Sequence, residues 1–185
     1  GLGDVYKRQI LRIFIMALTL FIAVSCRSGE DVRDSEPLPG SREMADMNKY
    51  LIQKDRERIE NYIERRGLDM KETPSGLWFS IEDEGAGEFF SDNDRIRIEY
   101  DCLLIDGTRC YSSQQQGPKD IVLGRSEMEP GLNEALRMLK PGGKGIFILQ
   151  PFLAFGLKGD GKNIPPRSVL VYNIYLTSLV PIPGQ

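Results

Sequence analysis

The sequence predicts an α+β domain with several antiparallel strands and one short helix, preceded by a separate helix. Two observations support this prediction. Residues 95–104 alternate between apolar and charged side chains and are followed by Asp106 and Gly107, a pattern that indicates a β-hairpin. Residues 41–66 and 130–139 instead repeat their apolar side chains at helical spacing. Several strands with few helices define the α+β class.

The N-terminal part is typical of an export signal. The apolar run at residues 10–25 is shorter than the roughly 20 residues that a spanning helix needs, so we interpret residues 1–25 as a signal peptide. Residues 1–9 are expected to be either adapter-encoded sequence or a fragment end, and they are left out of the fold prediction. Small residues precede Cys26, as in a bacterial lipobox, which predicts lipidation of Cys26. The alternative is an uncleaved membrane anchor with an incidental cysteine.

A tether and a helix are predicted next. Residues 26–40 are charged and contain Pro and Gly, so they are expected to form a lipidated tether without a core of its own. Residues 41–67 are predicted to be helical, with Ser41 as N-cap and Gly67 at the end. Asp55 interrupts the apolar stripe of this helix. The stripe consists of Met44, Met47, Leu51, Ile59, Tyr62 and Ile63. It could pack on the chain's own domain or on a second copy in a homodimer.

Residues 73–180 are predicted to form the main domain. Its expected strands cover residues 76–81, 95–104, 120–123, 146–149 and 169–179, and its short helix begins at Pro130. Asp106 and Gly107 are expected to form a two-residue type I′ turn. That turn would pair Leu103 with Cys110 and Cys102 with Tyr111. Cys102 and Cys110 would then lie on opposite faces, which prevents a disulfide between them.

Composition excludes several kinds of chemistry. The chain has no histidine, so it cannot hold a Ser-His-Asp triad or a His-ligated zinc ion. Its three cysteines form no CxxC pair, and we expect no metal. A net charge of -3 without a basic face argues against a nucleic-acid partner. The stretch at residues 156–163 nearly matches a phosphate-binding loop, but Asn163 replaces the required hydroxyl and Pro165 follows. We therefore expect no cofactor.

The ordered motifs of residues 76–179 resemble an FKBP-type peptidyl-prolyl cis-trans isomerase domain. The motifs are Tyr100, Asp106-Gly107, Ser112-Ser113, Leu123-Gly124, Gly131-Leu132, Pro141-Gly142-Gly143, Ala154-Phe155-Gly156, Ile164-Pro165-Pro166 and Leu170-Val171-Tyr172. Together with the lipobox, tether and preceding helix, they are most similar to the gliding-motility-associated isomerase lipoproteins of bacteria. The resemblance implies a twisted antiparallel sheet wrapped around one short helix, with an apolar pocket between them.

The resemblance also implies a site. The residues implied in catalysis are Tyr100, Tyr111, Leu132, Phe155 and Tyr172, and those implied in substrate binding are Cys110, Met128, Glu129 and Ile164. Leu132 would form the pocket floor, and the backbone N–H of Glu129 would bind a substrate carbonyl. The alternative is that these residues are simply core residues of a half-open barrel.

Two departures from the family pattern bear on activity. Cys110 and Tyr111 stand where the family usually has Phe-Asp, which predicts that an acidic acceptor at the pocket edge is missing. Phe155 stands where the family usually has Tyr, so a hydroxyl donor is lost. The resemblance implies an isomerase that acts on Xaa-Pro bonds of exported client proteins. Cys26 predicts a lipid anchor in the cell envelope, and Arg27 in place of Asp after it favours the outer membrane, facing the periplasm. The alternatives are a weakly active or non-catalytic prolyl-binding chaperone or assembly lipoprotein, and a purely structural lipoprotein.

Overall fold

The computed structural model describes residues 40–125 and 127–179, which contain one seven-stranded antiparallel sheet. The strands are β1 (Lys71–Glu72), β2 (Trp78–Asp83), β3 (Arg95–Leu104), β4 (Arg109–Ser112), β5 (Lys119–Val122), β6 (Lys144–Leu149) and β7 (Leu170–Leu179). The helices are α2 (Ser41–Arg66), α3 (Ser113–Gln116), α4 (Pro130–Leu136) and the 3-10 turn η1 (Pro151–Leu153). The predicted fold class, with its separate N-terminal helix, is confirmed.

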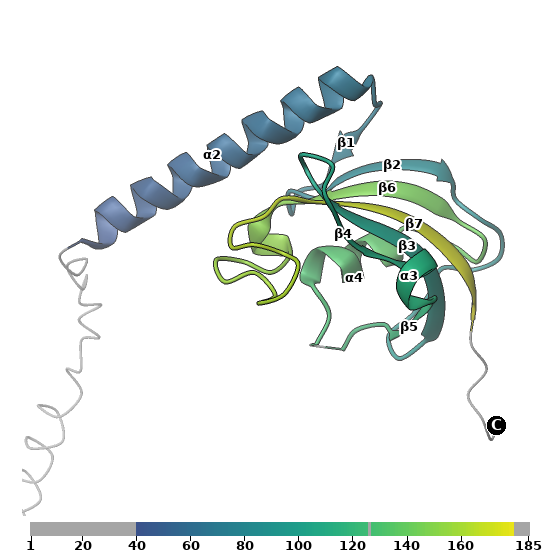
Figure 1. Ribbon diagram of the computed structural model, residues 1–185. Coiled ribbons are helices and arrows are strands. Elements are labelled where there is room, and N and C mark those ends of the chain that lie inside the picture. The colour runs from purple at the N-terminus through teal and green to yellow at the C-terminus, as the bar shows by residue number, and fades with distance from the viewer. Residues whose placement is uncertain (1–39, 126, 180–185) are drawn as a thin grey trace, which may run out of the picture. The chain divides into compact units, whose positions relative to one another are not determined.

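The strands follow the order β1-β2-β6-β7-β3-β4, and β5 pairs with β3 further along the same edge as β4. β3 and β7 form the longest pairing, from Ile96↔Leu179 to Leu104↔Leu170. Register shifts interrupt the ladders at Ile81/Asp83 and at Arg97/Ile98. Such bulges strengthen the local twist, and the sheet curves around α4 in Figure 1.

The main core lies between α4 and the inner, concave face of the sheet. Leu132, Ala135 and Leu136 of α4 are buried, and they belong to the same core cluster as Phe147 of β6 and Tyr172 of β7. The following turn tightens into i→i+3 hydrogen bonds, which leaves Leu139 in the core as well. The apolar spacing from Pro130 onward therefore indicated the inward face of this short helix correctly.

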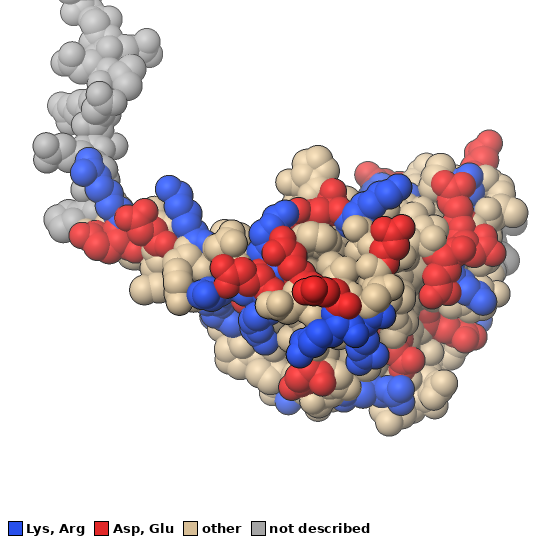
Figure 2. Space-filling model, turned by 90° about the horizontal axis from the view of Figure 1, so that it is seen from above, with Lys and Arg blue, Asp and Glu red and all other residues tan. Residues whose placement is uncertain are grey.

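A smaller core lies on the outer face of the sheet, where α2 packs. Ile59 of α2 is fully buried against Ile148, Val169 and Val171. Successive residues of β6 alternate between the two cores, since Phe147 faces α4 and Ile148 faces α2. This burial on both faces explains why β6 is a continuous apolar run. On the outer side, which Figure 2 shows, Lys and Arg are interspersed with Asp and Glu.

The hairpin between β3 and β4 differs from its prediction. Leu104 bonds to Thr108 across a three-residue loop, and only Gly107 in that loop has a positive φ, of 94°. The type I′ turn is therefore wrong, and a three-residue loop with glycine in its last position replaces it. Cys102 pairs with Tyr111 as predicted, but Leu103 pairs with Arg109 and not with Cys110.

This shift changes the position of the cysteines. Cys110 becomes the extra residue of a bulge and turns into the inner core, where Cys102 also lies. The prediction that the two side chains occupy opposite faces is therefore wrong. Both thiols are free and buried. Burial raises the pKa of the Cys102 thiol to about 12, so that it stays protonated near neutral pH.

Three short elements were not predicted, namely β1, α3 and η1. In α3, the Ser112 side chain accepts a hydrogen bond from the Gln114 N–H and caps four residues that have no apolar periodicity. Across the described ranges, no helix has the length and hydropathy that crossing a membrane requires. The run at residues 10–25 and Cys26 lie outside the described residues.

Candidate active site

A cavity of about 700 Å³ opens beside the inner core. Its walls come from β3, β4, the α3–β5 connection, the start of α4 and the loop between η1 and β7. We call this loop, residues 154–169, the pocket loop. The cavity therefore combines segments that are widely separated in the sequence.

Apolar and aromatic side chains form the deep part of the cavity. Leu132 is 1% exposed and is offered by the first turn of α4. The rings of Tyr100 and Tyr172 lie 6.4 Å apart between centroids at an angle of 39°, and Phe155 adds a further wall. Burial raises the pKa of both tyrosines, so these walls stay uncharged near neutral pH. Such a floor and walls can accept an apolar ring.

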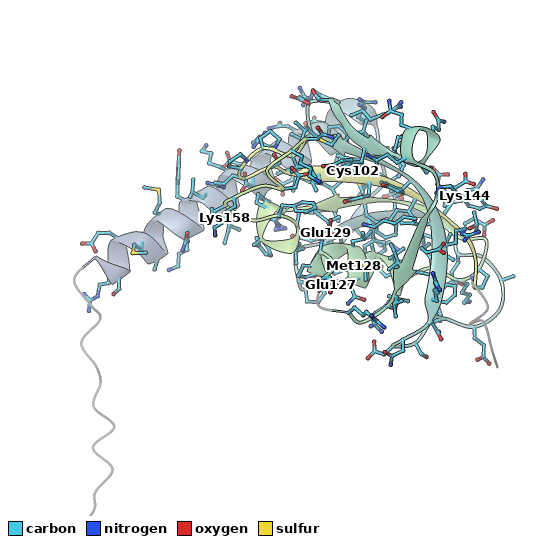
Figure 3. The ribbon with its side chains drawn as sticks, turned by 60° about the horizontal axis from the view of Figure 1, so that its bottom comes forward. Cys102, Glu127, Met128, Glu129, Lys144 and Lys158 are labelled. Carbon is cyan, nitrogen blue, oxygen red and sulfur yellow. The ribbon has the colours of Figure 1, made fainter. Side chains whose placement is uncertain are left out.

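The segment before α4 borders the same cavity. Glu127, Met128 and Glu129 follow one another into α4, as Figure 3 shows. Glu129 is the N-cap residue, and its carbonyl accepts a hydrogen bond from the N–H of Asn133 at 3.0 Å. Glu127 and Glu129 line the cavity, whereas Met128 packs against the core.

A hydrogen-bonded pair stands at the edge of the cavity. The Tyr111 hydroxyl donates to one carboxylate oxygen of Asp160. The other oxygen accepts the backbone N–H groups of Lys162 and Ile164, each at 2.8 Å. The bond to Asp160 raises the pKa of Tyr111 to about 12. Burial alone would raise the pKa of Asp160, but its hydrogen bonds with Tyr111 and the backbone lower it below the ordinary value.

A second bond fastens the same loop to β4. The Asn163 amide donates to the carbonyl of Cys110 at 3.1 Å. Gly159, with φ of 68°, allows the turn, because a Cβ there would approach the Ile164 carbonyl to 2.2 Å. The tip of the pocket loop is thus tied to Cys110 and Tyr111, two of the residues at which the chain departs from the family pattern.

The structure brings most of the predicted site residues together. Those that line the cavity are Tyr100, Tyr111, Glu129, Leu132, Phe155 and Tyr172. Cys110 and Ile164 are 7% and 2% exposed and belong to the core. Met128 is partly buried and packs against the same core. These three are chain neighbours of lining residues without lining the cavity themselves.

Sequence reasoning missed Asp160, and this omission changes one conclusion. An acidic acceptor was expected to be absent because Tyr111 stands at the usual aspartate position. Asp160 lines the cavity from the pocket loop and bonds to Tyr111 on β4, so an acidic group is present at the edge of the cavity. The sequence signal is the pair of glycines on either side of Asp160, which belongs to the stretch that nearly matches a phosphate-binding loop.

Comparison with known proteins agrees with this geometry. The sequence model of the FKBP-type peptidyl-prolyl cis-trans isomerase family matches residues 87–177. A probable FKBP-type isomerase of Haemophilus influenzae is 32% identical over 116 residues, which cover 63% of this chain and 48% of that protein. The outer membrane protein MIP of Legionella longbeachae is 33% identical over 57% of this chain and 45% of its own length.

The isomerase FkpA of Escherichia coli is similar in both sequence and structure. It is 32% identical over 70% of this chain and 47% of its own length. Its crystal structure superposes with a TM-score of 0.61, covering 76% of this chain and 65% of the FkpA chain. The chain spans about half the length of the curated relatives it matches. The shared fold, the cavity and the match at residues 87–177 show that this chain carries an FKBP-type peptidyl-prolyl cis-trans isomerase domain.

Proposed function

We propose that the chain is a peptidyl-prolyl cis-trans isomerase that acts on Xaa-Pro bonds of exported proteins. Rotation about a peptide bond has a barrier of about 18–20 kcal/mol, because resonance is lost in the twisted state. No proton has to move during this rotation. A chain without histidine can therefore catalyse it, provided that a pocket favours the twisted amide over the planar one.

The apolar floor of the cavity is the observation that supports this proposal. Leu132, Tyr100 and Tyr172 surround a space that can take the proline ring and remove water from the amide. Removing water disfavours the charge-separated planar form, while nearby donors can favour the twisted geometry. Tyr111 and Phe155 border the same space, and the Glu129 N–H is our candidate donor to the substrate carbonyl.

A proline-isomerisation assay on the purified chain tests the proposal directly. Chromogenic peptides with an Ala-Pro or Leu-Pro bond should isomerise faster in its presence. The added rate should be proportional to enzyme concentration. A rate equal to the uncatalysed one, at enzyme concentrations that saturate prolyl-peptide binding, would contradict it.

One observation favours a weaker, prolyl-binding role as the second candidate. Phe155 lines the cavity but has no hydroxyl with which to donate to a bound peptide. The protein would then bind prolyl segments of unfolded clients and act as a chaperone or assembly lipoprotein. Peptide binding without rate acceleration would support this candidate over the enzyme.

We further propose attachment to the cell envelope through a lipid on Cys26. The small residues before Cys26 and the name of the MIP relative, an outer membrane protein, support this. Detergent phase partitioning of membranes should place the wild type in the detergent phase and Cys26→Ala in the aqueous phase. A mutant that still partitions with detergent would show that the apolar run itself is the anchor.

A second copy of the chain is the proposed partner of the N-terminal half of α2. Several apolar side chains there are exposed, including Met44 (69%), Met47 (57%) and Tyr50 (56%). Exposed apolar side chains gathered on one helix are typical of association surfaces. Sedimentation velocity of the soluble chain would distinguish a dimer from a monomer.

A further inference from the structure

Asp55, which interrupts the apolar stripe of α2, is a buried carboxylate with a partner in the pocket loop. It is only 5% exposed. Arg167 donates from Nη2 to Asp55 Oδ2 at 2.5 Å, and the same nitrogen lies 3.5 Å from the Leu51 carbonyl. Arg58 lies 3.7 Å from the other carboxylate oxygen. A buried charge of this kind is strongly unfavourable unless it is paired. The Arg167 guanidinium provides the opposite charge that Asp55 requires.

The backbone of Arg167 closes the base of the pocket loop. Its φ of 56° is in the left-handed region, which side chains other than glycine seldom adopt. Its N–H donates to the carbonyl of Gly156 at 3.0 Å, so that the two ends of the loop meet there. Strained backbone of this kind persists only where the surroundings hold it. The Asp55 carboxylate holds the side chain of the same residue.

The pocket loop is therefore fixed at two points. Its tip is bonded to β4 through Asp160 and Asn163, and its base is bonded to α2 through Arg167. The loop presents Phe155, Asp160 and Asn163 to the cavity. α2 precedes the residues that the family model covers, 87–177. We propose that Asp55 and Arg167 are positioning residues of the prolyl site, through which α2 sets the conformation of the pocket loop.

A neighbouring ion pair provides a matched control. Arg56, next to Asp55 on α2, donates to both carboxylate oxygens of Glu72 on β1. This pair also ties α2 to the domain, but it does so at the sheet edge and has no bond to the pocket loop. Glu72→Gln and Asp55→Asn each remove one carboxylate charge from an ion pair of α2. Only Asp55→Asn removes the negative charge that faces Arg167.

Hydrogen exchange gives a readout that does not depend on activity. In Asp55→Asn, the hydrogen-bonded amides of residues 156–164 and of Arg167 should exchange at least about tenfold faster, because the ion pair that holds the base of the loop is lost. In Glu72→Gln, exchange of the same amides should stay as in the wild type. The charge exchange Asp55→Arg with Arg167→Asp should restore part of the protection. If Asp55→Asn does not fold, Arg167→Lys makes the same comparison, with a smaller increase.

The isomerase assay adds a kinetic readout that rests on the proposed function. Asp55→Asn should lower kcat/KM mainly by raising KM, since the floor residue Leu132 is not on the loop. Glu72→Gln should leave both constants unchanged. Unchanged exchange in Asp55→Asn, or an equal increase in Glu72→Gln, would overturn the inference. A wild type without isomerase activity would instead refute the proposed function, and the exchange comparison would still decide the role of Asp55.

Discussion

The two faces of the sheet bury apolar side chains in different ways. On the inner face, α4 packs against a large cluster of apolar and aromatic side chains that opens directly into the cavity. On the outer face, a few aliphatic residues around Ile59 are flanked by two ion pairs, Asp55–Arg167 and Arg56–Glu72. The same strands, β6 and β7, supply both faces.

This difference indicates different roles for the two faces. Apolar burial is strong but non-directional, so the inner core can build a pocket without specifying the exact place of a mobile segment. Hydrogen-bonded ion pairs depend on geometry, and they fix the register in which α2 lies along the sheet. The inner face therefore forms the candidate site, and in our proposal the outer face determines where the pocket loop is held.

The largest effect is expected from a charge placed in the inner face. Leu132→Lys should abolish isomerase activity, because an unpaired ammonium group at the pocket floor is costly to bury and returns polarity to the site. The measurement is kcat/KM for an Xaa-Pro peptide, with circular dichroism to confirm folding. Leu132→Met is the matched control, since its volume is similar and it should cost less than about 1.5 kcal/mol of stability. A folded Leu132→Lys protein as fast as the wild type would show that the cavity is not the site.

A smaller effect is expected from a cavity in the outer face. Ile59→Ala should lower the free energy of unfolding by about 2–5 kcal/mol, because Ile59 is fully buried between α2 and the sheet. Urea denaturation followed by circular dichroism measures this change. Met44→Ala, at an exposed position on the same helix, should change stability by less than about 0.5 kcal/mol. Equal effects of the two substitutions would mean that α2 does not unfold together with the domain.

The inner face was the more predictable of the two. The strict alternation of residues 95–104 predicted β3 to the residue, and helical spacing after Pro130 predicted the buried side of α4. These elements follow local periodicity, which a sequence displays directly. The family resemblance predicted which side chains would gather at the site, and most of them line the cavity.

The errors arose where contacts between distant segments decide the structure. The hairpin loop gained one residue, and Cys110 turned inward as the extra residue of a bulge. Asp160 reaches Tyr111 across 49 positions of sequence, and Arg167 reaches Asp55 across 112. No local pattern specifies such partners. Asp55 did give a signal, since a carboxylate within an apolar stripe requires a buried partner, but its partner could not be named from the stripe.

The smallest effect is expected from the polar edge of the inner face. Tyr111→Phe removes the hydrogen bond to Asp160 but keeps the aromatic ring, and Asp160 retains two backbone donors. One such bond contributes about 0.5–1.5 kcal/mol. If it acts in the transition state, kcat/KM should fall roughly 2- to 12-fold. Asp160 is only half-buried, whereas Asp55 is buried. Removing the hydrogen-bond partner of Asp160 should therefore cost less free energy than removing the partner of Asp55.

The pH dependence of the Tyr111→Phe effect provides the final test. The lowered pKa of Asp160 means that its contribution is present above the ordinary carboxyl value of about 3.9 and is lost as pH falls through the lower folded value. Tyr111, with its pKa raised to about 12, contributes fully below the ordinary value of about 10 and loses its contribution as pH rises through about 12. The ratio of wild-type to Tyr111→Phe kcat/KM should therefore be constant between about pH 5 and pH 9. A ratio that changes within this interval would mean that another titrating group controls the pocket edge, and that the pair of Tyr111 and Asp160 is not its polar element.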